Sequence, residues 1–279
     1  ASRQHAEKVT LVAAEALRCA GVSAGELDAV AATCAPGLIG ALLVGANFAK
    51  ACALSLGVPF IPVHHIRGHI AACYVACPDL QPPFTALVAS GGHTVVVDVE
   101  DYTHMTVIGR ARDDAAGEAF DKIARVLSLP YPGGAALDRL SQAGDANKYR
   151  LPRADVQGAP YDFSFSGLKT AAVNLTHNAA QKGEEIDRAS LAAGVCLAVS
   201  DAIVPRVIAA ARACGRKTVA AAGGVAANSL LRARLQAECE KHGLRLCLPP
   251  LSLCGDNGSM IAAQAYYEYM AGNVGDCGQ

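Results

Sequence analysis

Residues 84–100 read FTALVASGGHTVVVDVE, and this stretch decides which fold the sequence predicts. Two apolar runs rich in β-branched residues, 84–90 and 93–100, flank a tight Gly91-Gly92 pair, which is the pattern of a β-hairpin. Elsewhere the chain alternates strand-like and helical runs, the pattern of parallel strands joined by crossover helices. Because a hairpin and crossovers occur in one chain, we expect an α/β protein of two lobes and not a single barrel.

The other expected elements follow from the period of the apolar residues and from breaks at glycine and proline. We expect strands at 27–34, 59–65, 217–223 and 244–250. We expect helices at 5–20, 38–56, 66–77, about 116–128, 135–143, 166–181, 188–214, after Ala227, and at 257–271. The segment 144–165, rich in Gly, Pro and Asp, is expected to be an exposed excursion.

Length and charge exclude several classes of protein. The chain has 279 residues, 52% of them hydrophobic, which is enough to bury a large core. With 24 basic and 25 acidic residues the formal net charge is −1, so no overall positive field attracts nucleic acid. A role with nucleic acid therefore needs a local patch or a partner protein. No uninterrupted apolar run reaches the roughly 18 residues of a membrane span, so we expect no membrane contact.

The cysteines indicate a reducing compartment. There are 11, an odd number, and they are scattered through helix-like and strand-like runs without a C-x-x-C pair. We therefore expect buried, reduced thiols and a cytoplasmic protein.

The stretch VHHIRGHI, residues 63–70, is the first candidate for a functional site. If a helix starts near His65, then His65 and His69 share one face, a spacing that suits two imidazoles on one metal ion. The pair by itself is equally typical of ordinary surface or core histidines. Two features favour the metal: the pair follows a strand end, and LCGDNGSMIA at 253–262 supplies Asp256 in a Gly-flanked turn. Two histidines and a carboxylate with open positions suit Fe(II) or Zn.

A zinc peptidase of the H-E-x-x-H type is a competing interpretation of the same residues. It needs a glutamate directly after the first histidine as general base. Ile66 holds that place and Arg67 follows it, so the peptidase interpretation lacks its base.

Three glycine loops predict a nucleotide site. They are ASGGHT at 89–94, YPGGAALDRL at 131–140 and AAGGVAANSLLRARL at 221–235, the last with Asn228 near a helix start. Exposed N–H groups in such turns and at helix starts bind phosphate, and the absence of a Cβ lets a ligand approach. One Gly-Gly hairpin alone is usually only a hairpin, but three such loops favour a nucleotide held between lobes. None matches G-x-x-x-x-G-K-[ST] or G-x-G-x-x-G, which excludes a P-loop enzyme and disfavours a dinucleotide fold.

The acidic stretch RDDAAGEAFDK, residues 112–122, surrounds a predicted helix start. Asp113 and Asp114 suit a first turn, where carboxylates favour the helix dipole. Asp121 lies beyond that turn, and contact with a ribose or the ordering of a loop are both open to it.

The stretch FSFSGLKTA, residues 163–171, opens another predicted helix. Ser166 is the expected N-cap. Lys169 has two interpretations, a solvated side chain or a phosphate contact, and the solvated one is favoured.

These stretches occur together in one known family. HIRGH, ASGGHT, DDAAGEAFDK, YPGG, FSFSGLKTA, AGGVAAN and GDNGSMIA stand in the order seen in the tRNA N6-adenosine threonylcarbamoyltransferases, the TsaD family, formerly described as O-sialoglycoprotein endopeptidases. The chain resembles that family over essentially all of its length. The resemblance implies an actin/hexokinase/Hsp70-like ATPase fold with two lobes around a cleft. It also implies transfer of a threonylcarbamoyl group from threonylcarbamoyl-adenylate to N6 of the adenosine next to the anticodon in certain tRNAs.

The resemblance also implies site residues. It places the metal ligands on His65, His69 and Asp256, with iron or zinc as the usual metal. For the nucleotide ligand, threonylcarbamoyl-adenylate or ATP/AMP, the substrate-binding positions that it implies are Val88, Ala89, Ser90, Gly91, Gly92, Asp121, Gly134, Asp138 and Asn228. It assigns no general base, and we expect positioning by the loops and a metal acting as Lewis acid on the reacting carbonyl to suffice.

The family's partners follow from the same resemblance. In bacteria its members act on tRNA in the cytoplasm, together with an inactive paralogous subunit and a small P-loop ATPase. A chain without a basic surface of its own suits such an arrangement.

The sequence departs from the family pattern at three places. Arg67 stands where bacterial members usually carry a glutamate (H-M-E-G-H), and Ala89 replaces the usual valine of VSGG. The chain begins at ASRQH, which in the family lies inside the first lobe, so we expect that lobe to be incomplete at its N-terminus. The expected lobes are 1–83 with 257–279, and 84–256.

Two functions remain after this comparison besides the disfavoured peptidase. The three predicted metal ligands favour an active transferase. Arg67 and the expected incomplete first lobe favour a non-catalytic, nucleotide-binding scaffold of the same tRNA-modification complex.

Overall fold

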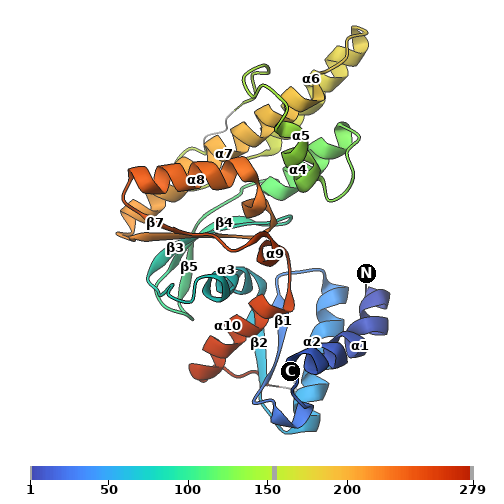
Figure 1. The fold of residues 1–279 in the computed structure, drawn as a ribbon, viewed down its shortest axis with the longest axis vertical. Coiled ribbons are helices and arrows are strands. Elements are labelled where there is room, and N and C mark those ends of the chain that lie inside the picture. The colour runs from blue at the N-terminus through green and yellow to red at the C-terminus, as the bar shows by residue number, and fades with distance from the viewer. Residues whose placement is uncertain (1, 153–155, 277–279) are drawn as a thin grey trace. The chain divides into compact units, whose positions relative to one another are not determined.

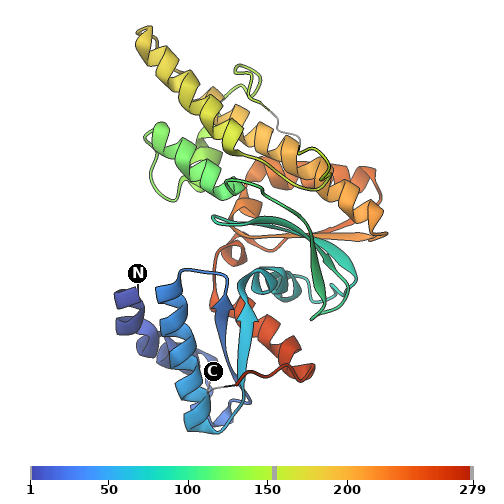
Figure 2. The same cartoon turned by 180° about the vertical axis from the view of Figure 1, so that it is seen from behind.

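The computed structural model describes residues 2–152 and 156–276 (Figures 1 and 2). The chain forms two compact units, Ala1–Val75 with Asn257–Gln279, and Ala76–Asp256. The division expected from sequence sets the first boundary after residue 83, whereas the compact units divide after Val75.

The first unit is built around one β-α-β crossover. Strands β1 and β2 pair in parallel, with Val30 opposite Phe60, and α2 connects them. The elements of this unit are α1 (Ser2–Ala20), η1 (Ala24–Glu26), β1 (Val30–Ala35), α2 (Ile39–Leu56), β2 (Phe60–His64), α3 (His65–Ala76) and α10 (Gly258–Met270).

The alternation of side chains along β2 decides which helix covers which face of the pair. Phe60 packs with Ala49 and Ala53 of α2, whereas Ile61 packs with Ala265 of α10. Because successive strand residues point to opposite faces, α2 and α10 lie on opposite sides of β1 and β2, as Figure 1 shows.

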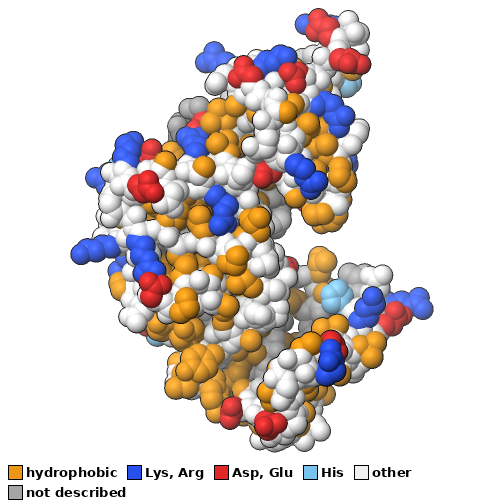
Figure 3. Space-filling view, viewed as in Figure 1, with side chains coloured by type: hydrophobic (Ala, Val, Ile, Leu, Met, Phe, Trp, Pro, Cys, Tyr) orange, Lys and Arg blue, Asp and Glu red, His pale blue; other side chains and the backbone are white. Residues whose placement is uncertain are grey.

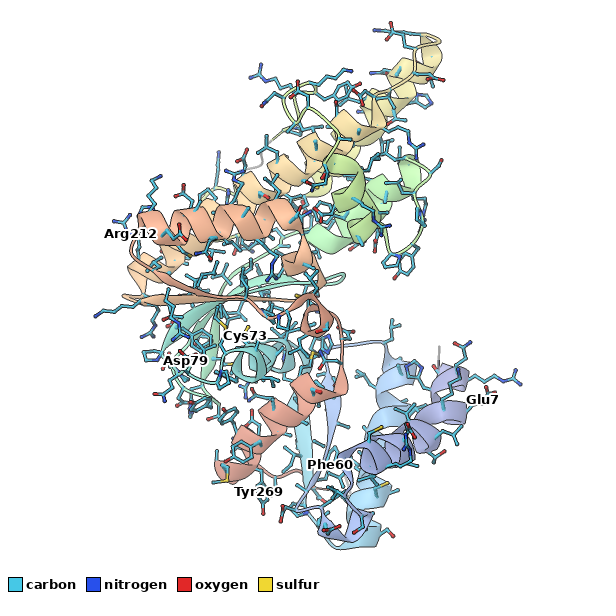
Figure 4. The ribbon with its side chains drawn as sticks, viewed as in Figure 1. Glu7, Phe60, Cys73, Asp79, Arg212 and Tyr269 are labelled. Atoms are coloured by element: carbon cyan, nitrogen blue, oxygen red, sulfur yellow. A yellow bond between two sulfur atoms is a disulfide. The ribbon has the colours of Figure 1, made fainter. Side chains whose placement is uncertain are left out.

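Apolar side chains remain exposed on the helices of this unit. Figure 3 shows them gathered over the C-terminal end of α10, where Tyr266 and Met270 are exposed. Tyr269 projects from the same end (Figure 4). The large exposed apolar residues of α1, α2 and the residue before α2 are Leu11, Val12, Leu38, Ile39, Leu43 and Leu54.

Two helices, α2 and α7 (Arg188–Ala213), have the length and composition of a membrane span. The expectation concerned uninterrupted apolar runs, and isolated Gly, Asn and Lys residues interrupt α2 without making it polar on average. Most of α7 is buried, as in the core helix of a water-soluble domain, whereas most of α2 is not. One or two such helices are weak evidence for a membrane.

The second unit contains a five-stranded sheet in the order β5-β4-β3-β6-β7. β3, β4 and β5 form an antiparallel meander, and β6 and β7 are added parallel to β3. The strands are β3 (Phe84–Ala89), β4 (Thr94–Val99), β5 (Met105–Arg110), β6 (Thr218–Ala222) and β7 (Arg245–Cys247). Besides α7, the helices are α4 (Ala116–Val126), α5 (Gly133–Ser141), α6 (Ser166–Gln181), η2 (Gly224–Ala227), α8 (Ser229–Lys241) and α9 (Leu251–Cys254).

The main core of this unit lies between the sheet and its helices. Helices α4 to α8 lie on one face of the sheet (Figures 1 and 2). Leu87 of β3, Phe120 of α4, Leu137 of α5 and Ile203 of α7 are all buried in a single apolar cluster there. The predicted hairpin is confirmed, with β3 and β4 in register from Phe84 to Val99.

A disulfide corrects the expectation of reduced thiols. Cys77 and Cys247 are bonded across a sequence separation of 170 residues, so β7 is tied to the residue that follows α3. The expectation of burial also fails in part, because Cys19 is exposed and Cys34, Cys52 and Cys214 are only half-buried. Spacing could not reveal the pair, since it is formed by the tertiary fold.

Candidate functional site

The two predicted metal-binding histidines are positioned by the junction of β2 and α3. β2 ends at His64 and α3 begins at His65, so no turn separates strand from helix. His65 and His69 stand one helical turn apart, with ring centroids separated by 4.7 Å and ring planes at 74°. His69 is fully buried and His65 is half-buried.

Asp256 is positioned by the start of α10. The next residue, Asn257, is the N-cap of this helix and accepts a hydrogen bond from the Met260 N–H at 2.8 Å. The ligand atoms of His65, His69 and Asp256 all lie within 4.8 Å of one another. The boundary between the two units falls directly after Asp256, so this carboxylate is one peptide bond from the unit that carries the histidines.

This donor set fits a divalent transition metal. Metal–ligand bonds of about 2.0–2.2 Å place pairs of ligand atoms roughly 3–4 Å apart, so only a small side-chain movement is needed to gather the three on one ion. Two imidazole nitrogens and one carboxylate oxygen suit Fe(II) or Zn and leave positions open for a substrate. Metal binding at these residues stays a prediction.

Arg67, between the two histidines, belongs to a partly buried polar network. Its Nη1 donates to Oε1 of Glu268 on α10 at 2.9 Å, and Gln264 Nε2 donates to the same oxygen at 2.9 Å. Asn273 Nδ2 donates to the other oxygen at 2.7 Å. Glu268 was not predicted, because nothing in its local pattern distinguishes it from a surface residue of a helix.

The first glycine loop follows the central strand of the second unit. β3 ends at Ala89, and the Ser90 N–H donates to the His93 carbonyl at 2.7 Å to close the turn. Val88 and Ala89 have fully buried side chains within the sheet, whereas Gly91 and Gly92 are exposed. Of the predicted stretch 88–92, the turn is therefore the exposed part.

Two glycines are required by close backbone approaches beside this loop. A Cβ on Gly117 would lie 2.4 Å from the Ser90 carbonyl oxygen, so α4 packs directly on the loop. Gly223 has φ of +93°, and a Cβ there would lie 2.3 Å from the Ala89 carbonyl oxygen. Part of the glycine pattern is therefore explained by packing, without a ligand.

A cavity of about 700 Å³ opens at the carboxyl ends of the parallel strands β3 and β6. This is where open α/β sheets bind their ligands, and the volume is within the range of small-molecule sites. All of its lining residues belong to the second unit. Five of the nine predicted substrate-binding residues line it, namely Gly91, Asp121, Gly134, Asp138 and Asn228.

Asn228 and Asp138 form a hydrogen-bonded pair at the wall of this cavity. Asn228 Oδ1 accepts from the Leu231 N–H at 3.0 Å and so caps α8, while its Nδ2 donates to Asp138 Oδ1 at 2.9 Å. Asp138 also accepts from the Ser229 hydroxyl at 2.7 Å. Behind the pair, burial raises the pKa of the Cys196 thiol to about 11, so its sulfur is a neutral acceptor for Asn228 Nδ2 at 3.4 Å.

Asp121 orders a loop and also lines the cavity. Its Oδ1 accepts a hydrogen bond from the Gly133 N–H at 2.7 Å, at the first residue of α5. Of the two roles left open by the sequence, the ordering of a loop is therefore present in the structure, and Asp121 is among the lining residues as well.

Asp113 joins the segment before α4 to the start of α6. It accepts from the Ser164 hydroxyl at 2.6 Å, from the Ser166 hydroxyl at 2.7 Å and from the Phe165 N–H at 2.8 Å. Burial acts to raise the pKa of Asp113, but these hydrogen bonds together lower it. Two expectations are corrected: α4 begins at Ala116, so Asp113 precedes its first turn, and Ser166 is the first residue of α6, not its N-cap.

Asp114 makes the second tie between the same segments. Its carboxylate binds the ammonium groups of Lys122 and Lys169, both at 2.9 Å. These hydrogen bonds, from Lys122 and then from Lys169, hold the pKa of Asp114 below its usual value. Lys169 is therefore paired, and the expectation that it is solvated was wrong.

Twelve lining residues were not among the individually predicted substrate-binding positions. They are Gly117, Phe120, Tyr131, Pro132, Ala135, Arg139, Gln142, Gly224, Val225, Ala227, Ser229 and Leu251. Eight of them lie within the predicted glycine loops 131–140 and 221–235, and Gly117 and Phe120 lie within the acidic stretch 112–122, so these motifs were the available signal. Gln142 and Leu251 lie outside these stretches and carried no such signal.

Solved structures share this fold at low sequence identity. The HypF of T. kodakarensis has a TM-score of 0.66 and 18% identity, over 90% of this chain and 42% of that chain. A full-length HypF in a phosphate- and nucleotide-bound form has a TM-score of 0.64 and 16% identity, over 86% of this chain and 46% of that one. Component A of the (R)-2-hydroxyglutaryl-CoA dehydratase of Acidaminococcus fermentans has a TM-score of 0.53 and 20% identity, over 91% of this chain and 81% of that chain. The chain is thus a mixed α/β protein with the fold of these structures.

Sequence similarity narrows this class to one family. The family model for tRNA N6-adenosine threonylcarbamoyltransferase (TsaD) matches residues 1–263. A relative of that name from Moorella thermoacetica is 49% identical over 270 residues, which are 97% of this chain and 79% of that protein. Another from Geobacillus thermodenitrificans is 51% identical over 277 residues, which are 99% of this chain and 80% of that protein. The chain belongs to the family of tRNA N6-adenosine threonylcarbamoyltransferases.

Proposed function

We propose that this chain transfers a threonylcarbamoyl group from threonylcarbamoyl-adenylate to N6 of the adenosine next to the anticodon of tRNA. Family membership carries the proposal, because the match runs over residues 1–263 and relatives named for this transfer are 49% and 51% identical. In the reaction the carbamoyl carbon forms a bond to N6 and its bond to the phosphate oxygen breaks. AMP leaves and N6 releases a proton.

We assign a divalent metal, Fe(II) or Zn, to His65, His69 and Asp256. The support is the donor set, whose ligand atoms lie within 4.8 Å of one another. When bound, such an ion supplies Lewis-acid polarisation of a carbonyl group. The chain's part is to hold the donors: α3 keeps the two imidazoles one turn apart, and the complete burial of His69 restricts its rotamers.

We assign the adenylate to the cavity of the second unit. Phe120 and Val225 offer apolar surface for a purine, and the carboxylates of Asp121 and Asp138 can accept hydrogen bonds from ribose hydroxyls. Gly134 lies in the first turn of α5, where backbone N–H groups lack intrahelical partners and attract phosphate. Holding the adenylate at several points fixes the direction in which AMP leaves.

We further propose the two-lobed actin/hexokinase/Hsp70-like ATPase architecture, with lobes near 1–83 plus 257–279 and 84–256. The two compact units and the ATPase-like neighbours support it.

We propose that the chain reaches tRNA in the cytoplasm with protein partners, an inactive paralogous subunit and a small P-loop ATPase. The net charge of −1 supports this, because the chain has no excess of positive charge to attract tRNA. Exposed apolar side chains on α1 and α2, such as Leu11 and Leu54, are surface that a protein partner covers.

A transfer assay tests the activity and both sites. The chain is incubated with threonylcarbamoyl-adenylate, unmodified tRNA and the partner proteins, and the digested tRNA is analysed by mass spectrometry for threonylcarbamoyladenosine. We expect the product with the unaltered chain, and we expect His69→Ala and Asp138→Asn to lose most of it. His104→Ala and Asp101→Asn change the same residue types on an exposed turn of the second unit and should keep it.

The outcomes separate the transferase from its alternative. Product that is lost only in the two site variants supports the proposal. Adenylate binding without any product from the unaltered chain and all partners identifies a nucleotide-binding scaffold.

A further inference from the structure

The Arg67–Glu268 pair ties together the two helices that carry or follow the predicted metal ligands. α3 carries both histidines, and α10 begins two residues after Asp256. Arg67 Nη1 and Glu268 Oε1 are 2.9 Å apart, with the Glu268 side chain only 7% exposed and that of Arg67 35% exposed. Both residues belong to the first unit.

Helix geometry separates Arg67 from the ligand face. Successive residues of an α-helix are rotated by about 100°, so His65 and His69 share one face and Arg67, two residues from each, points to the opposite side. Arg67 therefore faces α10 and its glutamate, not the donor atoms of the two imidazoles. Its role in the site is indirect.

Apolar packing also joins α3 to α10. A Cβ on Gly68 would lie 2.6 Å from Ile261 Cδ1, and the rings of Tyr74 and Tyr267 meet edge to face at 5.2 Å. Burial of apolar surface, as at Gly68 and Ile261, is not directional. A charge-assisted hydrogen bond is directional, and Gln264 and Asn273 complete the hydrogen bonding of the Glu268 carboxylate.

We propose that Glu268 is a positioning residue for the metal site. By binding Arg67 it fixes α3 against α10, and so holds the two imidazoles in register with the carboxylate that precedes α10. The inference rests on the proposed metal site at His65, His69 and Asp256. Arg67, which replaces the expected glutamate, is one member of this ion pair. The pair works with either member carrying the positive charge, as long as the two charges are opposite.

The proposal therefore predicts that the charges of Arg67 and Glu268 can be exchanged. A single charge reversal, Arg67→Glu or Glu268→Arg, places like charges together in a mostly buried position and separates the helices. The double reversal restores an opposite pair. Gln264 and Asn273 accept this change, because their side-chain amides can turn their oxygens toward a guanidinium.

Cobalt titration of the full chain tests the proposal. Co²⁺ takes the place of Fe(II) or Zn, and its visible absorption reports both affinity and ligand geometry. We expect Glu268→Gln to weaken Co²⁺ binding about tenfold, the size of effect seen when groups that orient metal ligands are removed. Arg67→Glu should weaken it at least as much, and Arg67→Glu with Glu268→Arg should return both the affinity and the spectrum toward those of the unaltered chain.

A matched control separates positioning from general loss of stability. Asp98→Asn removes a comparably buried carboxylate that Arg216 binds at 2.7 and 2.8 Å in the second unit. It should lower the thermal midpoint without altering the Co²⁺ affinity or spectrum. Far-UV circular dichroism checks that every variant is folded, and if Glu268→Gln does not fold, the double reversal carries the test.

Each result decides a different point. Co²⁺ binding by Glu268→Gln as tight as in the unaltered chain overturns the positioning role. A double reversal as weak as Arg67→Glu overturns the pairing, because the arginine itself is then required. Unchanged binding by His69→Ala overturns the proposed metal site and, with it, this inference.

Discussion

Asn228 connects the start of α8 to the cavity wall, and its replacement tests that connection. One side-chain amide makes two different contacts: its oxygen caps α8, and its nitrogen donates to Asp138 at 2.9 Å. Serine can keep the first contact but not the second, alanine loses both, and aspartate keeps the cap while placing a carboxylate against Asp138. The three replacements therefore separate the contributions.

The magnitudes follow from these contacts. Loss of an N-cap costs about 1 kcal/mol. Loss of the hydrogen bond to the Asp138 carboxylate costs about 1.5 kcal/mol, the low end for a charged acceptor, because Asp138 keeps its bonds from Ser229. We expect Asn228→Ser to lower the free energy of unfolding by about 1.5 kcal/mol and Asn228→Ala by about 2.5 kcal/mol. Asn228→Asp should be the worst near pH 7, since two carboxylates about 3 Å apart repel by roughly 5 kcal/mol at an effective dielectric constant of 20.

Urea unfolding followed by far-UV circular dichroism measures this order. The penalty of Asn228→Asp should shrink as the pH is lowered, because protonation of one carboxyl group turns repulsion into a hydrogen bond. Adenylate affinity, measured on the same variants, should fall in the same order. An Asn228→Asp chain as stable as the unaltered one at pH 7 would refute the contact with Asp138 and the reasoning built on it.

Three further perturbations have expected outcomes. Asp114→Asn removes a carboxylate whose pKa is lowered by two lysine ammonium groups. The stability that this carboxylate contributes is present above its usual pKa and is lost as the pH falls through its lowered pKa. The variant should be less stable at pH 6 and lose less stability than the unaltered chain between pH 5 and pH 2; equal acid profiles in urea contradict this. Leu137→Ala empties a fully buried position in the core of the second unit and should cost about 2–5 kcal/mol in urea unfolding, and a cost below 1 kcal/mol contradicts the packing. Cys77→Ser opens the disulfide and should lower stability by about 2–5 kcal/mol, whereas an unchanged thermal midpoint under oxidising conditions means that the bond does not form.

The sequence predicted those elements whose apolar period is strong. The hairpin at 84–100 and the long helix near 188–214 were found, because buried strands and core helices carry dense apolar patterns. β5 was missed. It is an edge strand of its sheet, five of its six residues are not buried, and an edge strand that faces solvent needs little apolar alternation.

Proximity across long sequence separations was not predictable from local pattern. The i, i+4 spacing of His65 and His69 is a property of one helix, so it could be read directly. The Lys169–Asp114 pair, the Arg67–Glu268 pair and the Cys77–Cys247 bond each join residues that only the tertiary fold brings together. Physical spacing rules for one element contain no information about such partners.

The Cys77–Cys247 bond makes most of the second unit a covalent ring. The backbone enters this unit at Ala76 and leaves it after Asp256, so nearly all of its residues lie between the two sulfurs. A single cut in the 144–152 segment therefore nicks the ring without releasing a fragment. On a denaturing gel the nicked chain migrates as one species without reductant and as two fragments with reductant. Gly91 and Asn228, on either side of such a nick, remain tethered at high effective concentration, so the cavity wall can survive cleavage of the chain that builds it.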